Sequence, residues 1–250
     1  KTRNKMTTAD LQKIMFLDIE TVPQTSSFSE LSDEMAELWE EKFQKLRIRM
    51  PEKYKENISA SEAFSSSAGI YSEFGKIVCI SVGFIYFHGE TMYFRTKSFA
   101  SDDEKIILKN FSDLISKFCS SKDNMLCGHN IKEFDIPYIC RRMLINGLEL
   151  PPVFQISGKK PWENNFLDTL ELWKFGDYKN YTPLKLLTAV FGIPTPKDDI
   201  DGSQVAQVYY HEKDIERIAM YCTKDVVATA QVFLRINGFQ LISPENIENQ

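Results

Sequence analysis

Two carboxylates stand at the end of an apolar run in the segment IMFLDIET (residues 14–21). The apolar residues 14–17 predict a buried strand, and side chains two positions apart on a strand point to the same face. Asp18 and Glu20 therefore lie side by side, where two like charges repel each other unless a cation lies between them. Paired acids beside a buried strand destabilise a fold unless they are compensated, so we expect this pair to bind a cation.

Other acids in similar settings have a simpler explanation. The pairs Asp102–Glu104 and Asp214–Glu216 have the same spacing, but each stands at the start of an expected helix, where the helix dipole stabilises a carboxylate. We expect these pairs to need no further role. Asp168 follows another expected strand, and a helix cap is the favoured interpretation over an acid that supports metal ligands.

Two further segments contribute acids with a candidate role. CGHNIKEFDIPYI (residues 127–139) places Asp135 at the start of an expected helix, and taken alone this acid is typical of a helix start. The segment YCTKD has Tyr221 and Asp225 at its ends, one turn apart on the same face of an expected helix. Asp225 lies in the middle of that helix among apolar residues, so we expect its carboxylate to be paired or metal-bound.

In this order, the segments DIE, NIKEFD and YCTKD resemble the three sequence motifs of the DEDD 3′→5′ exonucleases. The resemblance extends over about residues 12–236 and is greatest to the proofreading domain of family B DNA polymerases and to a related stand-alone bacterial group. The segments SEFGKIVCISVG and KDDIDGSQV also look like that group. The position five residues before the last acid holds Met220 rather than histidine, which implies the tyrosine branch, DEDDy.

The resemblance implies that four acids bind metal, namely Asp18, Glu20, Asp135 and Asp225. These acids would bind two divalent cations, Mg²⁺ or Mn²⁺, which prefer carboxylate oxygens as ligands. Asp18 would bridge both cations, while Glu20 and Asp225 would complete one site and Asp135 would hold the second through water. Two cations about 3.5–4 Å apart stabilise the attacking and leaving oxygens of a phosphodiester. A phenol has a pKa of about 10, so Tyr221 would orient the attacking water rather than deprotonate it.

Four residues near these motifs are candidates for substrate contacts. His129 and Asn130 stand on the expected loop of the second motif. His129 could touch a phosphate or the terminal base, but a hydrogen bond within the loop is the favoured interpretation. Phe134 could stack on a base, as aromatic side chains do in single-strand grooves, or lie in the core. Lys224 could contact the phosphate backbone, although a solvated lysine is the favoured interpretation.

The composition limits the classes of protein. The chain has 250 residues, 43% of them hydrophobic, and we expect a single exonuclease domain over residues 1–250. A formal net charge of −5 argues against a protein that coats long stretches of nucleic acid, but not against one that binds a few nucleotides through cations. No apolar run is long enough to span a membrane. Five cysteines without C-x-x-C spacing are expected to be reduced, buried thiols of a cytoplasmic protein, without zinc or disulfides.

A helical insertion of about residues 28–70 is expected after the first strand. Residues 29–56 are charged with apolar residues at helical spacing, and residues 58–69 predict a Ser/Ala-rich loop. From Lys42 to Lys55 there are six basic residues and one acid, an asymmetry that could guide a strand toward the cations. A helix with an ordinary mixed charged face is an equally good interpretation.

The order of the expected elements predicts an α/β fold. A hairpin of strands 76–87 and 90–99 follows the insertion, and strands then alternate with helices, the last at residues 214–236. This order predicts a mixed sheet flanked by helices, and the resemblance implies a ribonuclease H-like fold. Ligands on such sheets bind at the carboxyl ends of strands, where we expect Asp18 and Glu20.

We therefore expect a metal-dependent 3′→5′ exonuclease that removes nucleoside 5′-monophosphates from single-stranded DNA ends. The preference for DNA rests on the resemblance alone, and an RNA-trimming 3′→5′ exoribonuclease is the nearest alternative. A non-catalytic nucleic-acid-binding module and an enzyme for another phosphoester, such as a small nucleotide, are alternatives from other classes. The expected partner is a single-stranded 3′ end, and no contact with a membrane is expected. Any proofreading would act in trans with a polymerase or repair complex.

Overall fold

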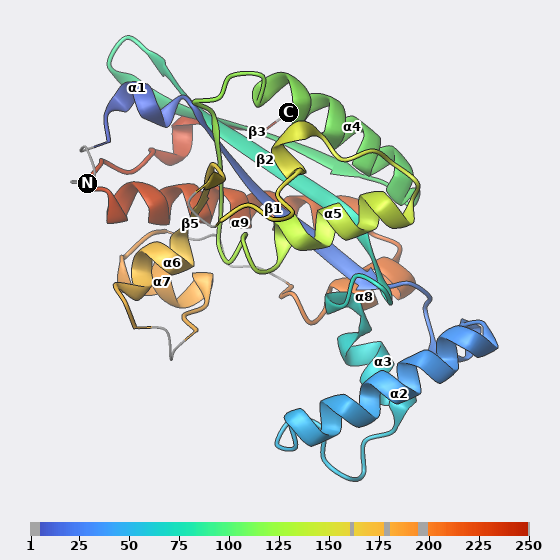
Figure 1. Cartoon of the computed structure of the whole chain (residues 1–250). Helices are drawn as coiled ribbons and strands as arrows, with labels where there is room; N and C mark the ends of the chain where they lie inside the picture. Colours follow the sequence, from blue (N-terminus) through green and yellow to red (C-terminus); the bar gives the residue numbers. More distant parts are fainter. Residues whose placement is uncertain (1–5, 161–162, 178–180, 195–199, 250) are drawn as a thin grey trace.

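The structure, a computed structural model, describes residues 6–160, 163–177, 181–194 and 200–249. Within these residues a sheet of six strands has the order β5-β4-β1-β2-β3-β6 (Figure 1). The strands are β1 (Ile14–Pro23), β2 (Gly75–His88), β3 (Thr91–Ala100), β4 (Met125–Gly128), β5 (Phe166–Asp168) and β6 (Ile247–Asn249). β1, β2 and β3 are antiparallel, whereas β4, β5 and β6 pair in parallel with their neighbours. The expected mixed sheet is confirmed, and β6, which has no apolar pattern, was not predicted.

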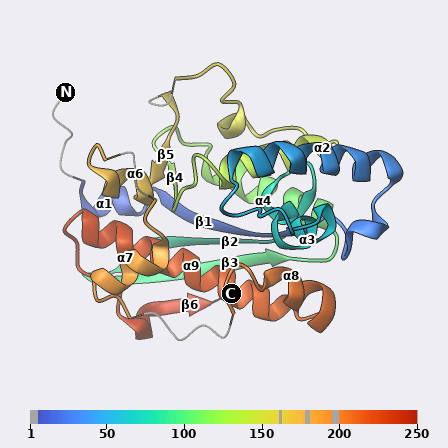
Figure 2. The same cartoon turned by 90° about the horizontal axis from the view of Figure 1, so that it is seen from below.

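Helices cover both faces of this sheet. They are α1 (Thr8–Leu11), α2 (Asp33–Arg49), α3 (Ala60–Ser67), α4 (Glu104–Phe118), α5 (Asp135–Ile145), α6 (Thr169–Lys174), α7 (Leu184–Val190), α8 (Val205–Gln207) and α9 (Ile215–Ile236). The longest, α9, runs along one face of the sheet, and α4 and α5 lie on the other (Figures 1 and 2). None of the helices in the described part of the chain is both long and apolar enough to cross a membrane.

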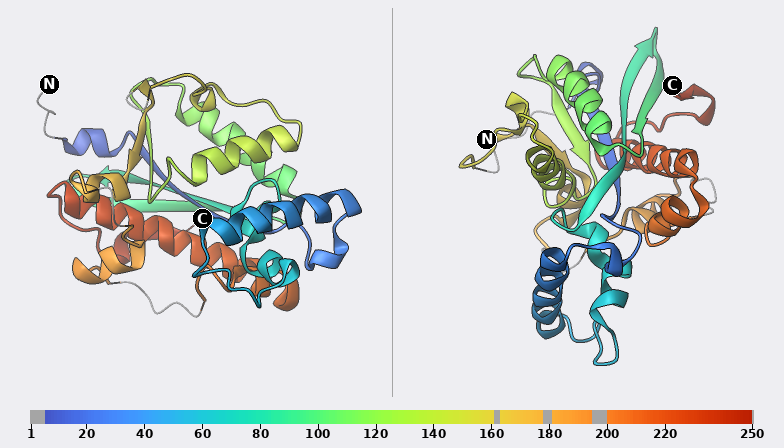
Figure 3. Two further views of the ribbon diagram at one scale, coloured as in Figure 1. Left: turned by 60° about the horizontal axis from the view of Figure 1, so that its bottom comes forward. Right: turned by 90° about the vertical axis from the view of Figure 1, so that its right-hand side faces the viewer.

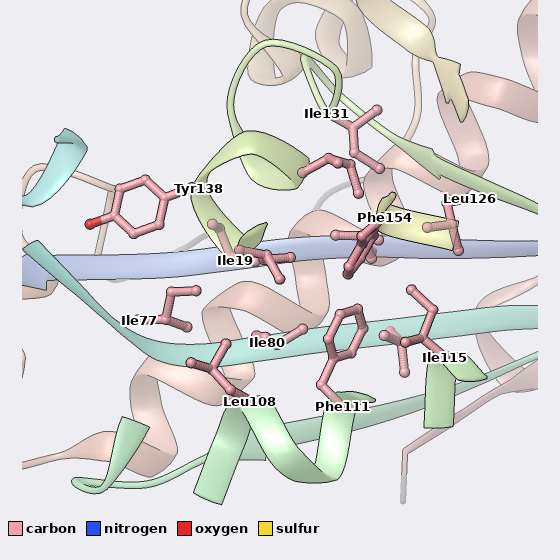
Figure 4. Close-up of a cluster of buried hydrophobic side chains, with 14 of the residues drawn as sticks. Ile19, Ile77, Ile80, Leu108, Phe111, Ile115, Leu126, Ile131, Tyr138 and Phe154 are labelled. Carbon is pink, nitrogen blue, oxygen red and sulfur yellow. The ribbon is translucent and has the colours of Figure 1, made fainter. Parts of the chain in front are cut away.

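The alternation of side chains along β1 separates two buried clusters. Phe16 points toward α9, where its ring centroid lies 5.6 Å from that of Phe233. Ile19 points to the other face, into the cluster between the sheet, α4 and α5 (Figure 4). Asp18 and Glu20 follow Phe16 in steps of two, so they share the face that α9 covers. Because β1 is covered on both faces and its side chains alternate between them, this pair of acids faces α9.

The chain between β1 and β2 forms α2 and α3, so the expected helical insertion after the first strand is present. These helices have their own buried cluster around Trp39, whose ring centroid lies 5.4 Å from that of Phe64 and 5.1 Å from that of Phe74. The indole N–H of Trp39 donates to the carbonyl oxygen of Ala60 at 2.8 Å. The right-hand view of Figure 3 shows α2 and α3 together at one end of the sheet.

The expected loop at residues 58–69 was wrong, because this stretch contains α3. Ser59 caps the helix, and its hydroxyl accepts the main-chain N–H of Glu62, whose carboxylate accepts the main-chain N–H of Ser59. This reciprocal capping box satisfies two of the N–H groups that a helix leaves free at its start. Ala63 and Phe64 then pack against α2, and this burial outweighs the weak helix propensity of the serines.

Glu104 has a structural role that its place at a helix start did not predict. Its side chain is buried, and one of its oxygens lies 2.6 Å from Nη2 of Arg142 on α5. The other oxygen accepts the main-chain N–H of Ile77 at 2.7 Å. The acid thus connects the start of α4 to α5 and to β2, and removal of one member of such a buried pair leaves an uncompensated charge.

Candidate active site

β1 is longer than the sequence indicated, and its acids lie within the strand rather than at its end. Pairing with β2 keeps the backbone extended as far as Pro23, with one irregularity directly after Glu20. The parallel pairing of β1 with β4 ends earlier, at Phe16 and Cys127. Asp18 therefore lies just beyond the carboxyl end of β4, which is the edge of the sheet where ligands bind in α/β folds.

The acids of β1 meet side chains from α9. The Sγ atom of Cys222 lies 3.4 Å from Oδ2 of Asp18. One ligand atom from each of Asp18, Glu20 and Cys222 lies within 4.8 Å of the other two. Tyr221 and Asp225 belong to the same helix, one turn apart, as expected.

Asp135 is the first residue of α5 and is 3% exposed. Asp168 holds the loop before it, because its carboxylate accepts the main-chain N–H groups of Asn130 at 2.9 Å and Lys132 at 3.2 Å. Asn130 has a φ of 64°, in the left-handed region. Asp168 also accepts the main-chain N–H of Leu170 as the cap of α6, so the cap interpretation is confirmed and a second function in positioning the loop is added.

A pocket of about 400 Å³ opens at this place. Its acids are Asp18, Asp135 and Asp225, and its other lining residues are Ile19, His129, Asn130, Phe134, Tyr181, Leu184 and Gly202. The pocket thus brings together three of the four predicted metal ligands and three of the four candidate substrate contacts. Glu20, Tyr221 and Lys224 are not among its lining residues, although Glu20 lies against the ligand atoms of the site.

Four lining residues were not predicted, namely Ile19, Tyr181, Leu184 and Gly202. Tyr181 is 62% exposed, and its ring meets the ring of His129 edge-on with centroids 6.2 Å apart. His129 donates from Nε2 to the carbonyl oxygen of Thr182 at 2.9 Å, and its Nδ1 lies 2.9 Å from Oγ1 of Thr169. His129 is hydrogen-bonded within the protein, but its partners lie on α6 and in the segment of Tyr181 rather than in its own loop as predicted, so it ties that segment to the start of α6. The only signal for Tyr181 in the sequence was an aromatic residue shortly before a helix.

Burial and mutual repulsion raise the pKa values of the acids. The pKa of Asp18 lies well above its usual range, mainly through burial and then through the charge of Glu20. The pKa of Glu20 is raised well above its usual range by burial, followed by the charge of Asp225. Burial also raises the pKa of Asp135 to about 7. In the absence of a cation the cluster therefore keeps protons near neutral pH, and a cation that binds there displaces them.

The donor set of the site fits divalent cations. Glu20 is 8% exposed, and its carboxylate makes no hydrogen bond with any residue that the structure describes. A buried carboxylate without a partner is costly, and a bound cation would offset both its burial and the repulsion from Asp18. Carboxylate oxygens are the ligands that Mg²⁺ and Mn²⁺ prefer.

A comparison with protein families supports a relation to nucleases. A family model described as a predicted 3′–5′ exonuclease related to the exonuclease domain of PolB matches residues 70–247, which is well over half of the chain. The matched region includes Asp135, Tyr221 and Asp225, and it begins after β1. No curated protein matches the chain.

Proposed function

The chain belongs to this family of predicted 3′–5′ exonucleases related to the exonuclease domain of PolB, and we propose that it removes nucleoside 5′-monophosphates from the 3′ end of single-stranded DNA. The six-stranded mixed sheet flanked by helices has the ribonuclease H-like architecture of such an enzyme. An exonuclease acts on nucleic acid, and the choice of DNA over RNA follows from the relation to a domain of a DNA polymerase.

The observation that carries the proposal is the meeting of acids from three separate elements at one pocket. Asp18 comes from β1, Asp135 from α5 and Asp225 from α9. Glu20 lies against Asp18, and both Glu20 and Asp135 are more than nine-tenths buried. Such a cluster of carboxylates, with raised pKa values in a pocket, is typical of a functional site rather than of a structural one. Exonuclease domains of this kind generally use divalent metals.

We assign the same roles to the acids as the sequence motifs imply. Asp18, Glu20, Asp135 and Asp225 would together hold the divalent cations. Mg²⁺ or Mn²⁺ at these positions would stabilise the attacking and leaving oxygens of the phosphodiester. Tyr221, one turn before Asp225 on α9, would orient the attacking water, because the pKa of a phenol is too high for a base at neutral pH.

The other lining residues support a place for the terminal nucleotide. The pocket is lined by three acids and by the rings of Phe134 and Tyr181, so the phosphate would lie at the acids and the base against the rings. His129 would position the segment of Tyr181 rather than touch the phosphate, because both of its ring nitrogens already have partners in the protein. Asn130 in the lining and Lys224 beside the last acid remain proposed contacts of the phosphate backbone.

The insertion would extend the substrate path. We propose that residues 1–250 act as one exonuclease domain and that the basic stretch of the insertion guides a single strand toward the pocket. Lys45, Arg49 and Lys53 of this stretch are exposed, as a phosphate-binding surface requires. A polymerase or repair complex is a proposed partner, and the free thiols of the five cysteines are compatible with the cytoplasm.

The test uses 5′-labelled single-stranded DNA and RNA of one sequence with Mg²⁺, Mn²⁺ or a chelator. We expect a metal-dependent ladder that shortens from the 3′ end, with DNA degraded faster than RNA, and no ladder with Asp18→Ala. Asp102→Ala is the matched control, because Asp102 belongs to an acid pair of the same spacing at a helix start and is exposed. A folded wild-type protein that degrades neither polymer would contradict the proposal, and faster degradation of RNA would reverse the choice of substrate.

A further inference from the structure

A buried thiol lies against the two acids of β1. Cys222 on α9 is fully buried, and its Sγ atom lies 3.4 Å from Oδ2 of Asp18 and 3.4 Å from the carbonyl oxygen of the same residue. Glu20 completes a group of three ligand atoms that all lie within 4.8 Å of one another. A sulfur ligand is not needed by Mg²⁺, which takes oxygen ligands, so the proposed reaction leaves the thiol without a role.

The spacing of these atoms fits a tetrahedral cation. With a Zn–S bond of about 2.3 Å and a Zn–O bond of about 2.0 Å, a sulfur and an oxygen at the tetrahedral angle lie about 3.5 Å apart. The separation of 3.4 Å between Cys222 Sγ and Asp18 Oδ2 is close to this value. The two atoms, which form a hydrogen bond in the protonated state, thus have the separation expected of two ligands of one zinc-sized ion.

Two further observations point to a ligand at this place. Glu20 is 8% exposed and has no hydrogen-bond partner among the described residues, so its carboxylate is available to a cation. Cys79 stands directly opposite Glu20 in the pairing of β1 with β2 and is fully buried, so a second thiol lies beside the acids of β1. Asp18 lines the pocket, which gives an ion a path from solvent.

We propose that Asp18, Glu20 and Cys222 form a site for a thiophilic divalent cation such as Zn²⁺. Binding converts the thiol of Cys222 to a thiolate and releases its proton to solvent, and the Zn–S bond favours zinc over Mg²⁺. Because the two acids are shared with the cations of the proposed reaction, zinc excludes them and inhibits the enzyme. The inhibition rests on the proposed function, whereas the binding of zinc does not.

The binding is tested with Co²⁺, which occupies zinc sites and gives a near-ultraviolet charge-transfer absorption when a thiolate coordinates it. We expect this absorption to saturate at one equivalent of Co²⁺ in the wild type, to be displaced by Zn²⁺, and to be lost in Cys222→Ser. Cys127→Ser is the matched control, because Cys127 is equally buried but lies in a different cluster, on β4. The melting temperature of each variant shows whether it folds. If the Cys222→Ser protein does not fold, Cys222→Ala is used in its place. No such absorption in the wild type, or full absorption in the folded Cys222 variant, would overturn the proposal.

The inhibition is tested separately in the presence of Mg²⁺. We expect the Zn²⁺ concentration that halves exonuclease activity to rise at least tenfold in Cys222→Ser, with each variant measured relative to its own activity in Mg²⁺ alone. An unchanged concentration would overturn the inhibitory role of the thiol. If the wild type shows no nuclease activity in Mg²⁺, the proposed function fails, while the cobalt spectrum still decides whether the thiol binds metal.

Discussion

Asp168 accepts the main-chain N–H of Asn130 at 2.9 Å, so an acid outside the pocket lining fixes the loop that leads to Asp135. The same carboxylate, which is 2% exposed, caps α6. One side chain therefore sets the start of α6 and the backbone before α5. The position of a proposed metal ligand thus depends on an acid that is not itself among the proposed ligands.

Replacement of Asp168 by asparagine should weaken both the fold and the site. An amide has one accepting oxygen in place of two, so at least one of the buried N–H groups loses its partner, which costs about 1–3 kcal/mol of unfolding free energy. We also expect kcat to fall, because the change displaces Asp135, a proposed metal ligand, together with the loop before it. Urea unfolding and steady-state kinetics measure these effects. Asp113→Asn, the same replacement at an exposed position on α4, is the control, and an Asp168→Asn protein with wild-type stability would refute the role.

The stability of the metal-free protein should fall as the pH rises from about 4 to about 7. Asp135 keeps its proton up to a pKa of about 7 in the folded chain, against 3.8 as its ordinary value, mainly because it is buried. The folded state then binds more protons than the unfolded state across this interval, so the unfolding free energy decreases with rising pH. Urea unfolding in a chelator at several pH values measures the slope.

Two further measurements test whether this pH dependence comes from the acid cluster. The variant Asp135→Asn should have a shallower slope, because the amide does not titrate. A cation at 100 times its dissociation constant should restore about 2.7 kcal/mol at pH 7 and above. Stability that rises with pH from 4 to 7 in the chelator would contradict the protonated state of the cluster.

The basic stretch of the insertion offers a test of substrate guidance. If Arg47 and Arg49 contact phosphates, their joint replacement by alanine should reduce the slope of log affinity against log salt by up to about 0.7 for each lost contact with a single strand. Fluorescence anisotropy with a labelled oligonucleotide measures the slope. Lys109 and Lys117, exposed on α4 and outside the pocket lining, provide the matched double replacement. A slope equal to that of the wild type would show that α2 does not guide the strand.

Tyr181 should contribute to binding of the terminal base. Removal of a ring that stacks on a base costs about 1–3 kcal/mol, so Tyr181→Ala should raise KM by roughly 5-fold to 150-fold. Tyr181→Phe keeps the ring and should leave KM within about twofold of the wild type. Tyr93→Ala on β3, outside the pocket lining, is the control for a general loss of an aromatic residue. Equal KM values for the alanine variant and the wild type would exclude stacking on Tyr181.

Local patterns in the sequence predicted the elements of the site but not their partners. The alternation of a strand was enough to put Asp18 and Glu20 on one face, and the helical repeat was enough for Tyr221 and Asp225. The extension of β1 through two acids was missed, because acids are rare in strands and only the pairing with the long strand β2 keeps the backbone extended. A local pattern contains no such information.

Other features were missed for two different reasons. The capping box of Ser59 and Glu62 was present in the sequence, but the serines around it suggested a loop. Tyr181 and Cys222 reach the site through contacts with residues 52 and 204 positions away, His129 and Asp18, which no local rule reveals. The short strand β6 also depends on a distant neighbour, β3.

The burial of α9 has a consequence for how the pocket responds to different substrates. Around Asp225 the helix is held by Cys222, Val226 and Ala230, all fully buried. Amide hydrogens in this part of the chain should exchange with solvent only when the whole molecule opens, whereas those near the exposed Tyr181 should exchange through small local fluctuations. If the proposed function holds, the carboxylates would keep a fixed spacing while the segment of Tyr181 adapts, and we expect similar rates of removal for all four bases.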